Sequence, residues 1–93
     1  MKSAYERAME RFGQNDPLPS LSDEQRAELA ALSDKYRAKI AERELFLNGL
    51  VEKAAAEGRY DEIPELKTQL AREVAALEAE CEAAKDKVRS AAG

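Results

Sequence analysis

The chain has 93 residues, a formal net charge of -4 and no histidine, and 37% of its residues are charged. This length fits one domain, and the abundance of Ala, Glu, Lys, Leu and Arg is typical of long helices and coiled coils. Because affinity for phosphate depends on clustered lysine and arginine, an acidic chain without a basic tail is expected to bind no nucleic acid. No segment approaches the roughly 20 apolar residues that would span a bilayer, so no membrane partner is expected.

The first residues, from Met1 to Arg7, lead into no continuous apolar stretch of the kind found in a signal peptide. The single cysteine, Cys81, cannot form a disulfide within the chain. These features together predict a cytoplasmic protein.

Residues 1–21 are expected to form a short amphipathic helix followed by a linker that contains proline. Tyr5, Met9 and Phe12 fall on one face of this helix, which Gly13 would end. Two prolines stiffen the linker at residues 15–20, since neither belongs in a helix interior. So short a helix is unstable alone, and it is expected either to dock on the rest of the molecule or to bind another protein.

A long helix is predicted from Ser22 to about Glu57. Its start matches a capping box, in which the side chain of Ser22 and that of Gln25 each accept a backbone N–H from the other residue. Gly58 is in position to end the helix in a left-handed conformation. Asn48-Gly49 is a turn signal inside this segment, but the apolar three-and-four spacing continues across it. We therefore expect a continuous helix, with Gly49 as a point of weakness or of close approach by a neighbour.

A second long helix is predicted to end at about Ser90, with Asp61 as its cap and Pro64 in its first turn. With a turn at 58–62, residues 22–93 would form a long antiparallel, coiled-coil-like hairpin of two helices. A turn centred near residues 59 and 60 places Arg43 opposite Leu77. The same register brings opposite charges together, pairing Lys35, Arg37 and Lys39 with Glu82, Glu80 and Glu78, Asp34 with Lys85, and Glu52 with Lys67.

The first long helix carries a second stripe of small and apolar residues, formed by Ala27, Ala31, Ala38, Ala41, Leu45 and Gly49, with Phe46 beside it. Large residues at 45 and 46 are costly to leave in water, so a second packing partner is indicated. The expected fold class is all-α, with the hairpin dimerising into a helical bundle. The residues predicted to contact a partner or the second copy are Tyr5, Met9, Phe12, Leu45, Phe46 and Gly49.

Residues suited to catalysis or to metal binding are scarce. The absence of histidine removes the usual general base and metal ligand, and the four glycines are isolated and form no phosphate-binding loop. Glu78, Glu80 and Glu82 around Cys81 alternate between helix faces and do not converge. We therefore predict no catalytic, cofactor-binding or metal-binding residue, and a non-catalytic structural or adaptor module that binds itself and, in one interpretation, an unidentified protein partner.

One alternative function is an enzyme. Lys35, Lys39 and Arg43 form a basic ladder beside Tyr36 that is either a solvated flank or an anion site. The segment Leu32–Arg43 resembles the long first helix of the small all-helical chorismate mutases, which are dimers of about this length. That resemblance implies that Arg43, with Lys53, would hold the carboxylates of a dicarboxylate substrate, and that catalysis would depend on placed charge without histidine.

Overall fold

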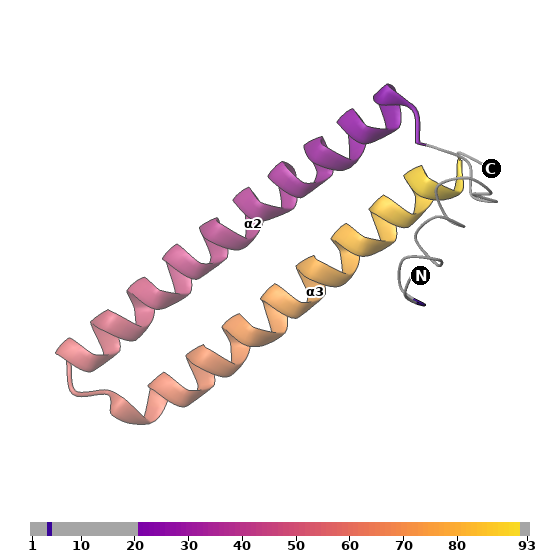
Figure 1. Ribbon diagram of the computed structural model, residues 1–93. Coiled ribbons are helices and arrows are strands. Elements are labelled where there is room, and N and C mark those ends of the chain that lie inside the picture. Colours follow the sequence, from indigo (N-terminus) through magenta and orange to yellow (C-terminus); the bar gives the residue numbers. More distant parts are fainter. Residues whose placement is uncertain (1–3, 5–20, 92–93) are drawn as a thin grey trace.

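The computed structural model describes residues 4 and 21–91 of the chain. Over this part it contains two α-helices, α2 (Asp23–Ala56) and α3 (Ile63–Ser90), joined through a 3₁₀ turn, η1 (Tyr60–Glu62), and no strand. The described part of the chain is therefore all-α, as the composition predicted. The helices α2 and α3 lie side by side and run in opposite directions (Figure 1).

The predicted N-terminal helix and its linker lie outside the described residues. The partner contacts predicted for Tyr5, Met9 and Phe12 lie outside them as well. The structure therefore bears only on the segment from residue 21 onward.

The start of α2 has the predicted capping box. The backbone N–H of Ser22 donates to Oε1 of Gln25 at 2.9 Å, and the backbone N–H of Gln25 donates to Oγ of Ser22 at 3.1 Å. The side-chain amide of Gln25 also donates from Nε2 to the backbone oxygen of Val88 at 3.3 Å. Because that carbonyl lies in the last turn of α3, where backbone acceptors lack partners within the helix, one glutamine caps α2 and ties it to the end of α3.

The end of α2 is closed by Gly58, as predicted. Its φ of +77° lies in the left-handed region, which glycine enters without a steric penalty. The backbone N–H of Arg59 donates to the oxygen of Ala54 at 2.8 Å, and that of Gly58 donates to Ala55 at 3.3 Å. These two bonds form a Schellman motif and satisfy carbonyls that the helix end leaves free.

The helix α2 runs without a break through Asn48 and Gly49, as the apolar spacing predicted. A Cβ built on Gly49 would meet nothing within 4 Å. No described neighbour therefore approaches Gly49 closely. Of the two roles predicted for this glycine, close approach by a neighbour is not found within the described chain.

The start of α3 differs from the prediction. Asp61 does not cap the helix, because it lies inside η1 and α3 begins two residues later, at Ile63. The residue at the cap position is Glu62, whose side chain makes no capping hydrogen bond. Pro64 does lie in the first turn, where its fixed φ suits the helix and its missing N–H leaves no bond unmade. The 3₁₀ turn occupies residues 60–62, so α3 begins only at Ile63, directly before Pro64.

The core between α2 and α3 is thin. Among the described residues only Leu47 and Ala54 are fully buried hydrophobic residues, each 1% exposed, and both lie in the half of α2 next to the turn. Each helix of a pair buries a single stripe, so most of the facing side chains stay half-buried. These half-buried residues are Leu29, Leu32, Tyr36, Ile40 and Leu50 on α2, and Leu66, Leu70, Val74, Leu77, Cys81 and Val88 on α3.

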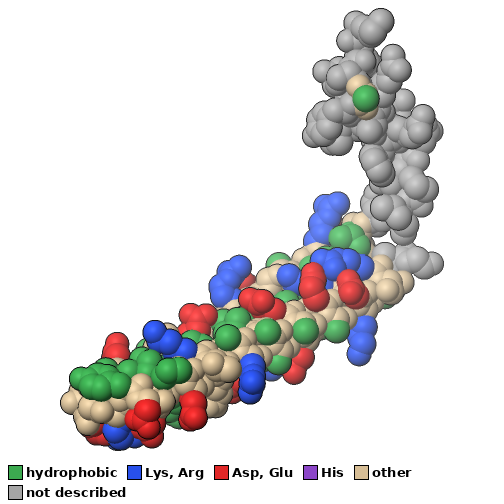
Figure 2. All heavy atoms as spheres, turned by 90° about the horizontal axis from the view of Figure 1, so that it is seen from below, with side chains coloured by type: hydrophobic (Ala, Val, Ile, Leu, Met, Phe, Trp, Pro, Cys, Tyr) green, Lys and Arg blue, Asp and Glu red, His purple; other side chains and the backbone are tan. Residues whose placement is uncertain are grey.

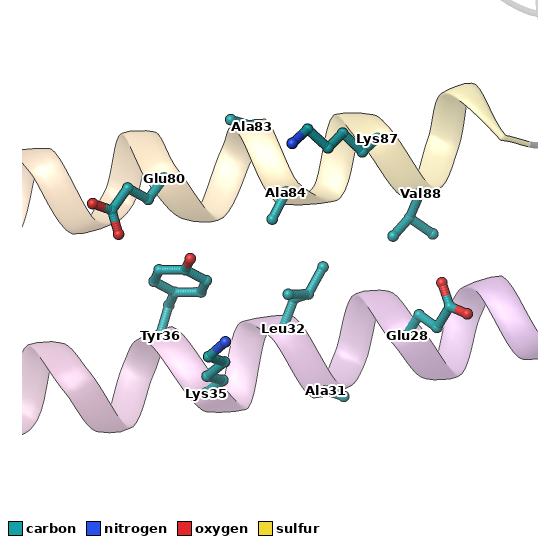
Figure 3. A pocket seen from close by; sticks show the side chains of 10 residues that line it. All are labelled: Glu28, Ala31, Leu32, Lys35, Tyr36, Glu80, Ala83, Ala84, Lys87 and Val88. Atoms are coloured by element: carbon teal, nitrogen blue, oxygen red, sulfur yellow. The ribbon is translucent and has the colours of Figure 1, made fainter.

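The register of the two helices also differs from the prediction. Arg43 pairs with Glu73, and not with Leu77 as predicted. Leu32 faces Ala84 across the gap between the helices (Figure 3). Both pairs are centred on Gly58, so α3 is displaced by about three residues, close to one helical turn, from the predicted centre near residues 59 and 60. The chain reverses at the left-handed Gly58, and η1 already belongs to the returning arm.

The predicted charge pairs between the helices are wrong, and Lys35, Arg37, Lys39 and the glutamates predicted opposite them are exposed side chains off the helix interface. None of the predicted pairs forms an ion pair in the described part of the chain, where Arg43–Glu73 is the single ion pair between α2 and α3. The exposed ion pairs are local instead, and they include Arg37 with Asp34 and Arg89 with Asp86. Exposed pairs of this kind contribute little to stability, so they do not select the register.

Candidate functional site

Two features of the helical pair offer a surface for binding. One is a groove between α2 and α3 at the end away from the turn, and the other is the exposed apolar pair Leu45 and Phe46 on α2. Apolar side chains lie open to solvent among charged side chains of both signs on the face shown in Figure 2. The candidate site is therefore an interaction surface.

The open-end groove has a volume of about 630 Å³ (Figure 3). Small residues shape it, because the small side chain of Ala84 points across to α2 and the exposed Ala31 and Ala83 leave the walls low (Figure 3). A groove with mainly apolar walls that is open to water is suited to receive a larger apolar side chain. Its complete lining is Glu28, Ala31, Leu32, Lys35 and Tyr36 from α2, with Glu80, Ala83, Ala84, Lys87 and Val88 from α3.

Charged side chains form the rim of the groove. Lys35 and Glu80 lie toward one end and Glu28 and Lys87 toward the other (Figure 3), but no ion pair joins either set of opposite charges. The three residues of the predicted basic ladder do not share one site, because Lys35 and Lys39 lie by Tyr36 and Arg43 does not. The ammonium groups of Lys35 and Lys39 lie 5.7 and 5.1 Å from the ring centre of Tyr36, within reach of a cation–π interaction, whereas Arg43 lies elsewhere.

Leu45 and Phe46 are exposed, as their position off the helix interface predicted. The exposed fraction is 79% for Leu45 and 55% for Phe46, against 1% for the neighbouring Leu47. Gly49 is also exposed, together with the alanines of the second stripe. All three of the predicted contact residues that the structure describes are therefore exposed.

Arg43 lies between Phe46 and Glu73. Its guanidinium carbon is 5.0 Å from the ring centre of Phe46, and Nη2 lies 3.0 and 3.2 Å from the two carboxylate oxygens of Glu73. Its buried Nε has no hydrogen-bond partner in the described structure. The charge of Arg43 is therefore already matched within the folded chain, and one side of the Phe46 ring is already covered.

The structure does not bring together the two residues that the enzyme alternative needs. Arg43 is paired with Glu73, and Lys53 lies in the last turn of α2, about 15 Å farther along the helix. Neither residue lines the open-end groove.

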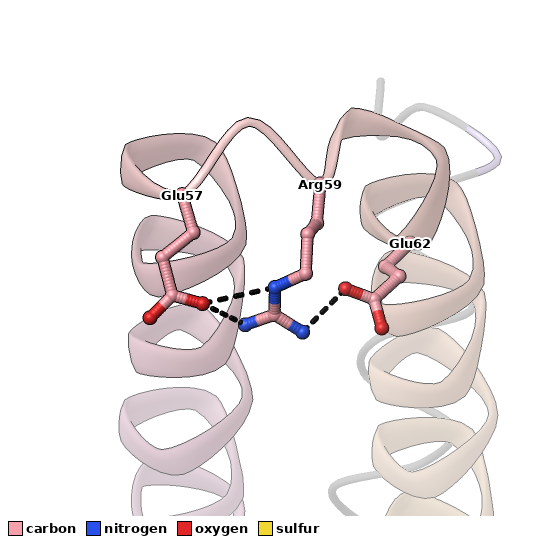
Figure 4. A network of polar contacts seen from close by, with 3 residues as sticks. All are labelled: Glu57, Arg59 and Glu62. Carbon is pink, nitrogen blue, oxygen red and sulfur yellow. Dashed lines mark hydrogen bonds and ion pairs between the residues drawn. The ribbon is translucent and has the colours of Figure 1, made fainter.

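A second polar cluster holds the turn together (Figure 4). Arg59 donates from Nε to Glu57 at 2.9 Å and from Nη1 to Glu62 at 2.5 Å, and its Nη2 lies 2.6 Å from the same oxygen of Glu57. The hydrogen bond to Glu57 raises the pKa of the guanidinium above its ordinary value. Because the pKa is raised, the guanidinium stays charged as the pH rises, and its contribution to these contacts is lost only in strong alkali. The cluster links the end of α2 to η1 at all physiological pH values.

Other chemistry is sparse in the part of the chain that the structure describes. Cys81 is a half-buried free thiol on α3. No group of three or more acidic, cysteine or histidine side chains among the described residues could hold a metal ion. No helix in the same region is long and apolar enough to cross a membrane.

Sequence reasoning identified the exposed Leu45 and Phe46 but missed the open-end groove. The signal for it was present, because Ala31, Ala83 and Ala84 are small residues on facing helices. Alanine is also the best helix former, and its packing role becomes visible only once the correct register brings these positions to the same height.

Comparisons of the chain with protein-family models, with curated proteins and with solved structures give no match.

Proposed function

We propose that this protein is a non-catalytic interaction module, in which a hairpin formed by α2 and α3 self-associates as a homodimer and serves a structural or adaptor role. The observation that carries the proposal is the exposure of Leu45 and Phe46 on a helical pair that fully buries only two hydrophobic residues among those described.

The energetic argument is one of unused apolar surface. Burying one large apolar side chain contributes about 1.5–3 kcal/mol, so Leu45 and Phe46 together offer a gain that the single chain forgoes. A two-helix unit has little core of its own, and a partner subunit is a common way to complete it. Two such pairs packed face to face would form a four-helix bundle.

The enzyme alternative receives no support from the site. Its principal residue, Arg43, is held by Glu73, and the groove contains neither Arg43 nor Lys53. The interaction module remains the proposal that fits the exposed surface.

Sedimentation velocity over a concentration series tests this proposal. We expect a dimer at micromolar concentration and at least a tenfold weaker dimer when Leu45 and Phe46 are both replaced by alanine, since each 1.4 kcal/mol lost from binding is about tenfold in affinity. Tyr60→Ala is the matched control, because Tyr60 is a similarly exposed aromatic residue, at 66%, but lies in η1 and away from the apolar stripe. A wild-type chain that stays monomeric would overturn the proposal.

A further inference from the structure

We infer that the open-end groove is the receptor for Phe46 of a second copy, so that the dimer packs α2 against α2 in antiparallel orientation with each Phe46 filling the groove of the other subunit. This inference rests on the proposed self-association and adds the geometry of the contact. The groove of one chain is incomplete without the ring supplied by its partner.

The first support is the placement of the groove and Phe46 on the same side of α2. Phe46 follows Lys35 by 11 residues and Glu28 by 18, which correspond to about three and five complete helical turns. Both of these earlier residues line the groove, so Phe46 projects in nearly the same direction as they do. The ring lies about 21 Å along the helix axis from Leu32, at 1.5 Å per residue.

This arrangement is self-complementary. A two-fold dimer uses the same surface on both subunits, so a surface with one projection and one hollow can match itself when the axis passes midway between them. The midpoint between Leu32 and Phe46 is at Lys39. An antiparallel α2–α2 contact centred there places each Phe46 at the height of the partner's groove, and the two insertions form together.

Size complementarity gives the second support. The groove is hollow because alanine occupies positions 31, 83 and 84, while Phe46 presents a large ring that is 55% exposed. A phenylalanine side chain buries of the order of 150–250 Å² when covered, and contact with the ring of Tyr36 on the groove wall would add an aromatic pair. The small residues on one surface thus match the large residue on the other.

The charges along α2 are mixed in this contact. In an antiparallel contact centred on Lys39, residue 42 of one subunit lies opposite residue 36 of the other. Glu42 therefore comes within one helical turn of the partner's Lys35 and Lys39, and the two-fold axis repeats this arrangement. These three side chains are exposed on the single chain. Each exposed pair is worth only a few tenths of a kcal/mol, and the same register sets Lys39 of the two copies against each other at the axis, so the charges do not select this register.

Photo-crosslinking in the full chain tests the inference. We would place p-benzoylphenylalanine at position 46, where it keeps an aromatic ring, and mix the variant with an equal amount of ¹⁵N-labelled wild type. We expect mass spectrometry to find cross-links between chains, from position 46 to peptides that contain residues 31–36 or 83–88. The same photoreactive residue at position 60 is the control and should give none of these cross-links.

The outcomes separate the inference from the proposed function. Cross-links from position 46 to residues 1–20, to another protein or to residues 45–50 of the second copy would overturn the groove assignment. A dimer in sedimentation that gives no cross-link to the groove would overturn the inference and leave self-association standing. A monomer would overturn both.

A filled groove provides a second test. Ala83 is an exposed residue on the groove wall, so Ala83→Phe should fill the hollow without disturbing the contact between α2 and α3. We expect about tenfold weaker dimerisation with unchanged helicity by circular dichroism. Ala75→Phe adds the same ring at another exposed position of α3 that lies outside the groove, and it should leave the dimer intact. Equal dimerisation of both variants and the wild type would contradict the inference.

Discussion

The two ends of the helical pair are built differently. Toward the turn, Leu47 and Ala54 are fully buried, Gly58 closes α2 in a Schellman motif, and Arg59 bridges Glu57 and Glu62. At the open end no described side chain is fully buried, and a groove of about 630 Å³ lies between the helices. Among the described residues, one hydrogen bond, from the side chain of Gln25 to the backbone oxygen of Val88, joins α2 to α3 at this end.

This difference places the tightest packing of the helical pair near the turn and its open groove at the other end. The turn end buries its apolar side chains between the helices, whereas the open end has alanines along a groove that is open to water. Regions that carry few buried contacts are the ones most available for ligands and partners. Substitutions of buried residues should therefore change folding most, and substitutions of exposed residues or of the groove wall should change association most.

The largest expected effect comes from Leu47→Ala. Removing most of a fully buried leucine side chain should destabilise the fold by about 2–4 kcal/mol, because it loses apolar burial and leaves a cavity. Urea unfolding followed by circular dichroism measures this. Leu45→Ala, two residues away on the exposed side, should leave the stability of the monomer within about 0.5 kcal/mol. Equal losses in the two variants would contradict the difference in burial.

The next effect compares two glycines. Gly58→Ala should destabilise the fold by about 1–2 kcal/mol, because alanine pays a steric penalty at a positive φ. Gly49→Ala should stabilise α2 by up to about 1 kcal/mol, since the added methyl meets no neighbour within 4 Å and alanine is the better helix former. Thermal unfolding at a concentration where the chain is monomeric measures both. Changes in the unfolding temperature of the same sign for both variants would contradict the different roles assigned to the two glycines.

A smaller effect is expected for the ion pair between the helices. A double-mutant cycle of Arg43→Met and Glu73→Gln should give a coupling of about 0.5–1 kcal/mol, because both side chains are partly shielded from water. The control cycle, Arg37→Met with Asp34→Asn, concerns a pair whose side chains are 78% and 77% exposed, and its coupling should be near zero. A larger coupling in the control would show that Arg43–Glu73 contributes no more to stability than an exposed pair within one helix.

The smallest effect belongs to the open end. Gln25→Glu keeps an oxygen that accepts the N–H of Ser22 but loses the donor to Val88, so it should cost under about 1 kcal/mol. Gln25→Ala loses both contacts and should cost more. Hydrogen exchange of the last-turn amides of α3 reads out the loss locally. Unchanged exchange in both variants would show that this bond does not hold the open end together.

Much of the fold could be predicted because its signals are local. The capping box at Ser22, the left-handed Gly58, the continuity of α2 through Gly49 and the place of Pro64 each depend on a few neighbouring residues. Exposure of Leu45 and Phe46 followed from helical periodicity, which assigns a residue to a face without knowledge of the opposite helix. The wrong cap at Asp61 followed from the 3₁₀ turn, since a capping residue alone does not fix where a helix starts.

The sequence by itself determined two long helices, both ends of α2 and the side of α2 that stays exposed, because hydrophobic spacing and backbone conformation act within a few residues. Only the tertiary structure decided the register, since a shift of one helical turn preserves the apolar face almost unchanged. In the observed register Arg43 meets Glu73, where Leu77 was predicted, and Ala31, Ala83 and Ala84 line one groove. Pairing across a turn depends on how the backbone reverses at Gly58, and periodicity carries no information about that geometry.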